Sequence, residues 1–68
     1  MNEREVKIMD KTYILEQYRL ATLDFQTAHS EEEQWNARKN MARLERIAFE
    51  SYGNELDEEF EKMKSEII

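Results

Sequence analysis

The sequence predicts an all-α fold: an antiparallel helical hairpin followed by a short third helix, in one domain spanning residues 1–68. Three observations lead to this prediction. The chain has no proline and one glycine, and it therefore lacks the residues that break helices. A helix-start motif follows residue 29, and apolar residues recur at intervals of three, four and seven along three segments. These segments are about 10–28, 31–52 and 55–67.

The first segment places apolar residues on one helical face. Ile14, Tyr18 and Phe25 fall on that face by the 3.6-residue period, and we predict that they are core residues. Asp10 or Thr12 is suited to cap the start of this helix. Residues 1–9 allow two interpretations, a helical extension or a short strand with Val6 and Ile8 alternating, and we favour the helix.

The second segment has the clearest boundaries. In Ser30-Glu31-Glu32-Glu33, the Ser30 hydroxyl accepts from the backbone of Glu33, and the Glu33 carboxylate is expected to reach back to the backbone of Ser30. Gly53 ends the helix, because glycine adopts a left-handed conformation at low cost. The link Thr27-Ala28-His29 is short, which predicts that the first two helices are antiparallel neighbours.

The third segment is an acidic amphipathic helix. Its predicted cap is Asn54, and its apolar stripe consists of Leu56, Phe60, Met63 and Ile67. We predict that the first three of these are core residues.

The second helix carries two apolar stripes, more than one neighbouring helix can cover. One contains the predicted core residues Met41 and Leu44. The other places Trp35, Ala42 and Phe49 seven residues apart, with charged residues between the two stripes. If the third helix covers this second stripe, the protein has a simple three-helix core. If not, the stripe is an interface for a partner or a dimer, which we predict to consist of Trp35, Arg38, Ala42, Glu45 and Phe49.

The size of the chain favours self-association. Domains shorter than about 70–80 residues usually need a disulfide, a metal or a second subunit for stability. The chain has no cysteine, and its one histidine, His29, with Glu32 and Glu33 nearby, is better explained as a loop residue than as a metal ligand. We therefore expect no metal and no cofactor, and we predict a homodimer or higher oligomer that forms a helical bundle.

Charge argues against nucleic acid as the main partner. Arg38, Lys39, Arg43 and Arg46 give the second helix a local basic character, yet the chain carries a net charge of −6. A solvated face, or a match to the acidic third helix, explains these cations better. The acidic third helix in turn allows an alternative function, a DNA-mimicking or DNA-binding regulator.

Nothing in the sequence predicts catalysis. It has no cysteine nucleophile and no glycine-rich phosphate loop, and a chain this small rarely encloses a pocket that shifts carboxylate pKa values. No signal peptide or membrane span is predicted, and the lack of cysteine is compatible with a cytoplasmic location.

One short run supplies an enzyme-class alternative. Asn54-Glu55-Leu56-Asp57 resembles the Ser-Gln-Glu-Leu-Asp signature of small helical-hairpin aspartyl-phosphate phosphatases that act on sporulation response regulators. Three residues match, and Gly53-Asn54 stand in place of Ser-Gln. The function we predict first is a non-enzymatic protein-interaction module or regulator, of the sort encoded in compact bacterial or phage operons.

Overall fold

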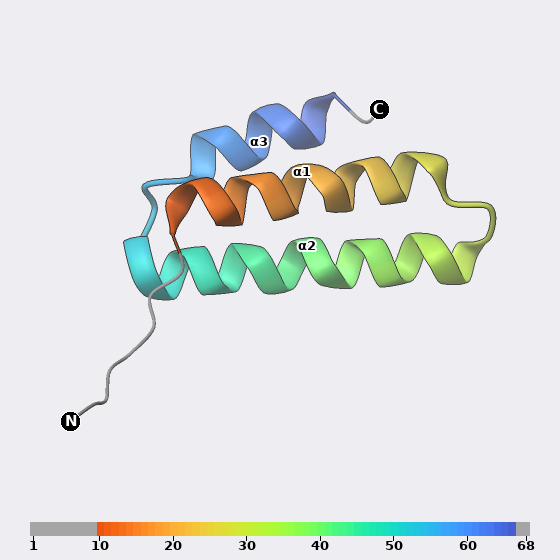
Figure 1. The fold of residues 1–68 in the computed structure, drawn as a ribbon, viewed down its shortest axis with the longest axis horizontal. Coiled ribbons are helices and arrows are strands. Elements are labelled where there is room, and N and C mark those ends of the chain that lie inside the picture. The colour runs from red at the N-terminus through yellow and green to blue at the C-terminus, as the bar shows by residue number, and fades with distance from the viewer. Residues whose placement is uncertain (1–9, 67–68) are drawn as a thin grey trace.

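The computed structural model describes residues 10–66, which form three helices (Figure 1). They are α1 (Lys11–Thr27), α2 (Glu31–Tyr52) and α3 (Asp57–Ser65). α1 and α2 pack as a hairpin, and the short α3 packs against α1. The all-α prediction is confirmed. The expected extension at 1–9 and the stripe residue Ile67 lie outside the described residues.

The turn between α1 and α2 follows the predicted motif with one change. Ser30 is the N-cap of α2, and its Oγ accepts a hydrogen bond of 3.2 Å from the Glu33 N–H. The Glu33 carboxylate, however, accepts from the N–H of His29 at 2.8 Å, one residue earlier than a capping box requires. Both bonds fix the start of α2 and turn the chain back along α1.

The break between α2 and α3 is centred on Gly53. Its φ of 65° is a conformation that only glycine adopts cheaply, and its N–H donates to the Phe49 carbonyl at 2.8 Å. Asn54 does not cap α3, contrary to the prediction. The helix begins later, at Asp57, with Leu56 at the cap position and without a side-chain cap. Asn54 and Glu55 form part of the turn that carries the chain from α2 to α3 and brings Leu56 into the core.

α1 begins without side-chain help. Asp10 occupies its N-cap position, but the carboxylate makes no capping hydrogen bond, so the predicted Asp10 cap is present only as a backbone contact. That contact is a 3.0 Å bond from the Ile14 N–H to the Asp10 carbonyl. Packing of the buried face, rather than capping, therefore accounts for this end of the helix.

The core lies where the three helices meet. Tyr18 and Ile14 of α1 are fully buried, and the Tyr18 ring packs on Phe60 of α3 with ring centroids 4.3 Å apart. The cluster of buried residues contains Ile14, Tyr18, Ala21, Met41, Leu44, Ala48, Leu56 and Phe60. Met63 is partly buried against this cluster, whereas Phe25 is half-buried and lies outside it.

Phe25 is the one predicted core residue that neither belongs to the cluster nor packs against it. α3 runs beside the first part of α1 and ends before the last turns of that helix (Figure 1). Phe25 belongs to those last turns, where α2 is the helix beside α1 and, among residues 10–66, only the Gln26 side chain bonds to the end of α3, at the Glu66 carbonyl. Within residues 10–66, no helix is long and apolar enough to cross a membrane.

Candidate functional site

The two faces of α2 have different surroundings. Ala37, Met41, Leu44 and Ala48 are buried against α1. Trp35 and Phe49, the largest apolar side chains on α2, are 61% and 60% exposed. α3 packs on α1 and does not cover them. The simple three-helix core, in which α3 covers the second stripe of α2, is therefore not what the structure shows.

Four of the five predicted interface residues form one exposed strip. Successive α2 residues are rotated by 100°, so Trp35, Ala42 and Phe49, seven apart, share one side with Arg38 between them. All four are exposed. We call these residues the outer strip. From Trp35 to Phe49 it spans about 21 Å, at 1.5 Å for each of 14 steps.

Glu45, the fifth predicted residue, is engaged within the chain instead. Its Oε2 accepts a 2.5 Å hydrogen bond from the Tyr18 hydroxyl and lies 3.5 Å from Nζ of Lys64. The carboxylate thus joins all three helices, and Glu45 is half-buried. Sequence reasoning placed it between two stripes but had no means of showing that Tyr18 would face it.

This contact changes the acidity of Tyr18. Burial raises the pKa of the phenol above its ordinary value, and the hydrogen bond to Glu45 raises it further. The charges of Glu45 and Glu61 act in the same direction, because they oppose a second negative charge nearby. Tyr18 is therefore held as a neutral hydrogen-bond donor that supports the core.

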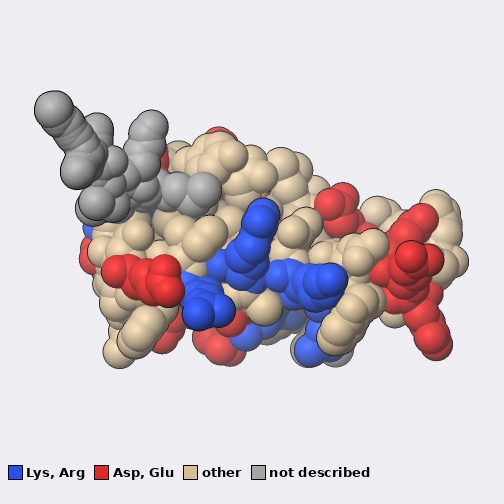
Figure 2. Space-filling model, turned by 90° about the horizontal axis from the view of Figure 1, so that it is seen from below, with Lys and Arg blue, Asp and Glu red and all other residues tan. Residues whose placement is uncertain are grey.

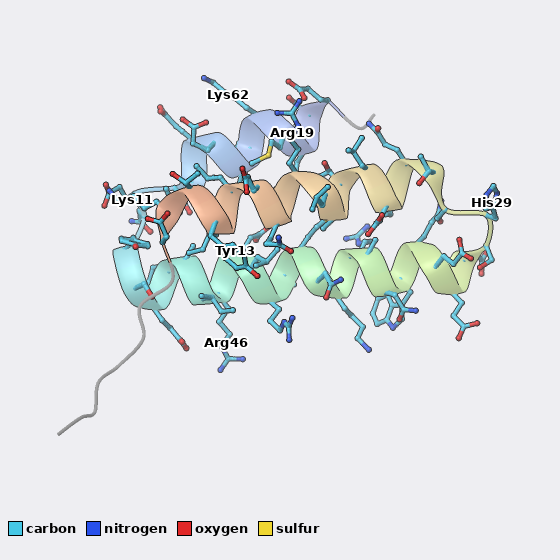
Figure 3. The ribbon with its side chains drawn as sticks, in the orientation of Figure 1. Lys11, Tyr13, Arg19, His29, Arg46 and Lys62 are labelled. Atoms are coloured by element: carbon cyan, nitrogen blue, oxygen red, sulfur yellow. The ribbon has the colours of Figure 1, made fainter. Side chains whose placement is uncertain are left out.

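A group of cations overlaps the outer strip at Arg38 and extends beside it. We call this group, Arg38, Lys39, Arg43 and Arg46, the basic cluster. Figure 2 looks onto this side of α2: Lys and Arg side chains gather over the middle, and acidic side chains lie toward both ends. Figure 3 shows Arg46 projecting away from α1.

Most of these cations have no partner within residues 10–66. Arg46 is paired with Glu50, one turn further along α2, at 3.5 Å. No ion pair or side-chain hydrogen bond to a described residue engages Arg38, Lys39 or Arg43. The ion pair between α2 and α3 has the opposite polarity, with the carboxylate of Glu45 on α2 and the ammonium of Lys64 on α3. The acidic α3 therefore does not neutralise the basic cluster.

A shallow hollow lies at one end of the outer strip. It is lined by Phe25, Glu31, Gln34, Trp35 and Arg38. Phe25, which the sequence assigned to the core, is therefore an apolar neighbour of Trp35 at the surface. No spacing rule links residue 25 to residue 35, because they lie on different helices.

A second apolar face lies on the other side of the hairpin. Tyr13 and Leu20 of α1 are 48% and 53% exposed, and they line a groove with the half-buried Ile47 of α2. The sequence contained no signal that Ile47 would join Tyr13 and Leu20, because they lie on different helices. In Figure 3 Tyr13 lies over the seam between α1 and α2.

One further hollow is an open groove of about 470 Å³ between α1 and α3. It is lined by Thr22, Met63 and mostly charged or amide side chains. His29 is exposed at the bend (Figure 3). No group of three His, Asp or Glu side chains in the described part of the chain could hold a metal ion.

The phosphatase-like run is used mainly by the fold. Leu56 is 5% exposed in the core, and Glu55 pairs with Lys11 at the start of α1. Asp57 is the first residue of α3 and is exposed. Packing accounts for Leu56, and the contact between the turn and α1 accounts for Glu55.

Comparison with known proteins adds no assignment. No protein-family model, curated protein or solved structure matches this chain.

Proposed function

We propose that this protein is a small non-enzymatic interaction module or regulator that binds another protein through the outer strip of α2. The observation that carries the proposal is the exposure of Trp35 and Phe49 on the same side of one rigid helix. Leaving side chains of this size in water forgoes roughly 1.5–3 kcal/mol each relative to burial. Trp and Arg, both present in the strip, are the residue types that most often dominate protein-binding energy.

Two properties of the strip fit binding better than packing within the chain. It belongs to a 22-residue helix whose opposite face is buried, so its residues are held in place before any partner arrives. Arg38 is also uncommitted within residues 10–66 and is available for a charge-assisted hydrogen bond.

The test compares proteins captured from cell extract by three forms of the tagged chain. The wild type should retain a stoichiometric protein partner. The double variant Trp35→Ala, Phe49→Ala should lose it. Leu23→Ala, which truncates an exposed apolar side chain on α1, serves as the matched control and should retain it. Circular dichroism of each variant establishes that the helices remain.

Two outcomes would overturn the proposal. One is a partner that both variants retain equally, which would mean that the outer strip is not the binding surface. The other is a predominance of nucleic acid in the captured material, which would favour the DNA-binding alternative. The phosphatase alternative has its own test, release of phosphate from a phosphorylated response regulator.

We further propose that the chain self-associates, and that the second apolar face mediates this contact. Tyr13, Leu20 and Ile47 lie on the side of the hairpin away from α3 and have no covering layer among residues 10–66. Two copies joined here would form the helical bundle that the size of the chain favours. Leu20→Glu should convert a dimer to a monomer in sedimentation equilibrium, and a monomeric wild type at micromolar concentration would refute self-association.

A further inference from the structure

We infer that the partner of the outer strip is an acidic amphipathic helical segment of another protein. This inference rests on the proposed function and specifies the chemistry of its binding partner. It is carried by the charge beside the strip: Arg38, Lys39, Arg43 and Arg46 lie along α2, and three of them have no ion-pair partner within residues 10–66.

The basic cluster is local, because the chain as a whole is acidic. The net charge is −6, yet the exposed charged side chains from Arg38 to Arg46 are all positive. Complementary charge on a partner would speed encounter and select against other partners. A partner with acidic residues beside its apolar anchors therefore fits this surface, whereas a basic or neutral one does not.

The length of the cluster limits what can bind. From Arg38 to Arg46 it covers about 12 Å, which is about two helical turns. In sequence, Glu31, Glu32 and Glu33 precede the cluster along α2 and Glu50 follows it. Figure 2 shows acidic side chains toward both ends of the blue group. A long, uniformly negative polymer would meet these carboxylates at both ends. A peptide segment whose acidic residues are confined to about two turns avoids this repulsion, which favours protein over nucleic acid.

A second copy of this chain fits the same face poorly. In an antiparallel pair centred on Ala42, Trp35 would face Phe49 of the second copy. The same two-fold axis would, however, bring Lys39 close to Arg46 of the second copy, and this happens twice because such an interface pairs a surface with itself. On the other side of the axis Arg38 would meet Glu45, whose carboxylate is already engaged by Tyr18 and Lys64. Like charges brought together in this way disfavour the pair. The cluster therefore indicates a different, acidic surface.

The apolar anchors indicate the form of the segment. Trp35, Ala42 and Phe49 repeat every seven residues, so they present two large side chains with a small one between them along a single side of α2. A helix lying along α2 can place apolar residues of its own on both sides of Ala42, where the approach is closest. Such a segment needs about 15–18 residues to cover the 21 Å strip.

The experiment uses two synthetic peptides of about 18 residues, matched to this length. They share leucines at heptad a and d positions. One carries glutamate beside the leucines of its two central turns, and the other carries lysine at the same positions. Binding is followed by the emission of Trp35, the only tryptophan in the chain. We expect the glutamate peptide to bind and to shift the emission to the blue. Its affinity should fall as salt is raised, because salt screens exposed charges.

Charge reversal on the protein supplies the matched control. Arg38→Glu with Lys39→Glu removes two cations of the cluster that have no ion-pair partner within residues 10–66, and should weaken the glutamate peptide about tenfold. The control is Arg19→Glu with Lys62→Glu, which produces the same change in net charge. Arg19 lies on α1 and Lys62 on α3, away from the outer strip (Figure 3), so the affinity should stay nearly unchanged.

The inference is overturned if the glutamate peptide fails to bind at about 1 mM, a weak affinity near −4 kcal/mol. Equal binding of both peptides, or equal weakening by both double variants, would also overturn it. Tighter binding of a 15-nucleotide single-stranded DNA would show that the cluster recognises phosphate. If Trp35→Ala, Phe49→Ala still loses the captured cellular partner, the proposed function survives any of these results and only the acidic character of the partner is rejected.

Discussion

The inner and outer faces of α2 belong to the same helix, yet the smaller side chains are buried and the larger ones are exposed. The inner face presents Ala37 and Ala48 beside Met41 and Leu44, and these small residues let α1 approach closely. The outer face presents Trp35 and Phe49, which are more than half exposed. The comparison teaches that hydrophobic size does not decide burial here. What decides it is which side of the helix the short turn at residues 28–30 directs toward α1.

The largest expected effect of a substitution is on the inner face. Leu44→Ala would leave a cavity among Ile14, Tyr18 and Met41, members of the same buried cluster, and should reduce the free energy of unfolding by about 2–5 kcal/mol. For a chain of this size, that loss approaches the whole stability. Urea denaturation followed by circular dichroism measures it. A loss below about 1 kcal/mol would mean that the inner face is not the core, since small effects are typical of surface positions.

Tyr18→Phe removes the hydrogen bond from the Tyr18 hydroxyl of α1 to the Glu45 carboxylate of α2. We expect a loss of about 1–3 kcal/mol at pH 7, because the half-buried Glu45 carboxylate would lose its donor.

The same variant has a defined pH dependence. The pKa of Tyr18 is raised in the folded protein by burial and by Glu45, so the unfolded chain ionises first, above about pH 10. The stability that Tyr18 contributes is present below that pH and is lost as the pH rises further. The difference between wild type and Tyr18→Phe should therefore shrink between pH 9 and pH 11. A constant difference would show that the phenol is not held neutral by the fold.

Gly53→Ala tests the C-terminal end of α2, where Gly53 is the cap residue. An alanine Cβ would meet no atom within 4 Å, so any loss comes from the backbone, whose φ is 65°. The expected loss is about 1–2 kcal/mol, the usual cost of a left-handed conformation for a residue with a Cβ. Asn54→Ala is the control, because that side chain does not cap α3, and its effect should stay within about 0.5 kcal/mol. Equal effects of the two changes would argue against this account of the turn.

The smallest expected effect is that of Trp35→Ala on stability. With 61% of the side chain exposed, its removal should change the free energy of unfolding by no more than about 0.5 kcal/mol. Association with the partner should weaken strongly, and this contrast with Leu44→Ala separates an interface from a core. If Trp35→Ala destabilises the isolated chain as much as Leu44→Ala does, then Trp35 packs within the fold. Measurements at several protein concentrations keep self-association from blurring the comparison.

The sequence contained enough to predict the helices and their breaks. Ser30 and Gly53 act through local backbone chemistry, and local chemistry is what a sequence shows directly. The start of α3 was predicted too early, because Asn54 is a favourable cap residue in isolation. The need to bring Leu56 into the core extended the turn instead.

The placement of α3 and the composition of the site were beyond local reasoning. An apolar stripe shows that a helix packs, but it does not show against which neighbour. The sequence therefore left open whether α3 covers Trp35, and the structure shows that α3 packs on α1 instead. The surroundings of Glu45 and Phe25 were beyond prediction for the same reason. Each depends on a residue of another helix, Tyr18 in the first case and Trp35 in the second.

The three-residue turn at Ala28–Ser30 also has a consequence for the order of folding. Closing so short a loop costs little entropy, so α1 and α2 can pair early. Docking of α3 instead joins residues far apart in sequence, as in the pair of Lys11 with Glu55, 44 positions away. α2 spans about 33 Å against about 26 Å for α1, so a completed α2 delivers the chain just past the start of α1. The length of α2 therefore sets where α3 begins along α1: deleting one turn of α2 would move the start of α3 by about 5 Å, away from its present place beside Lys11.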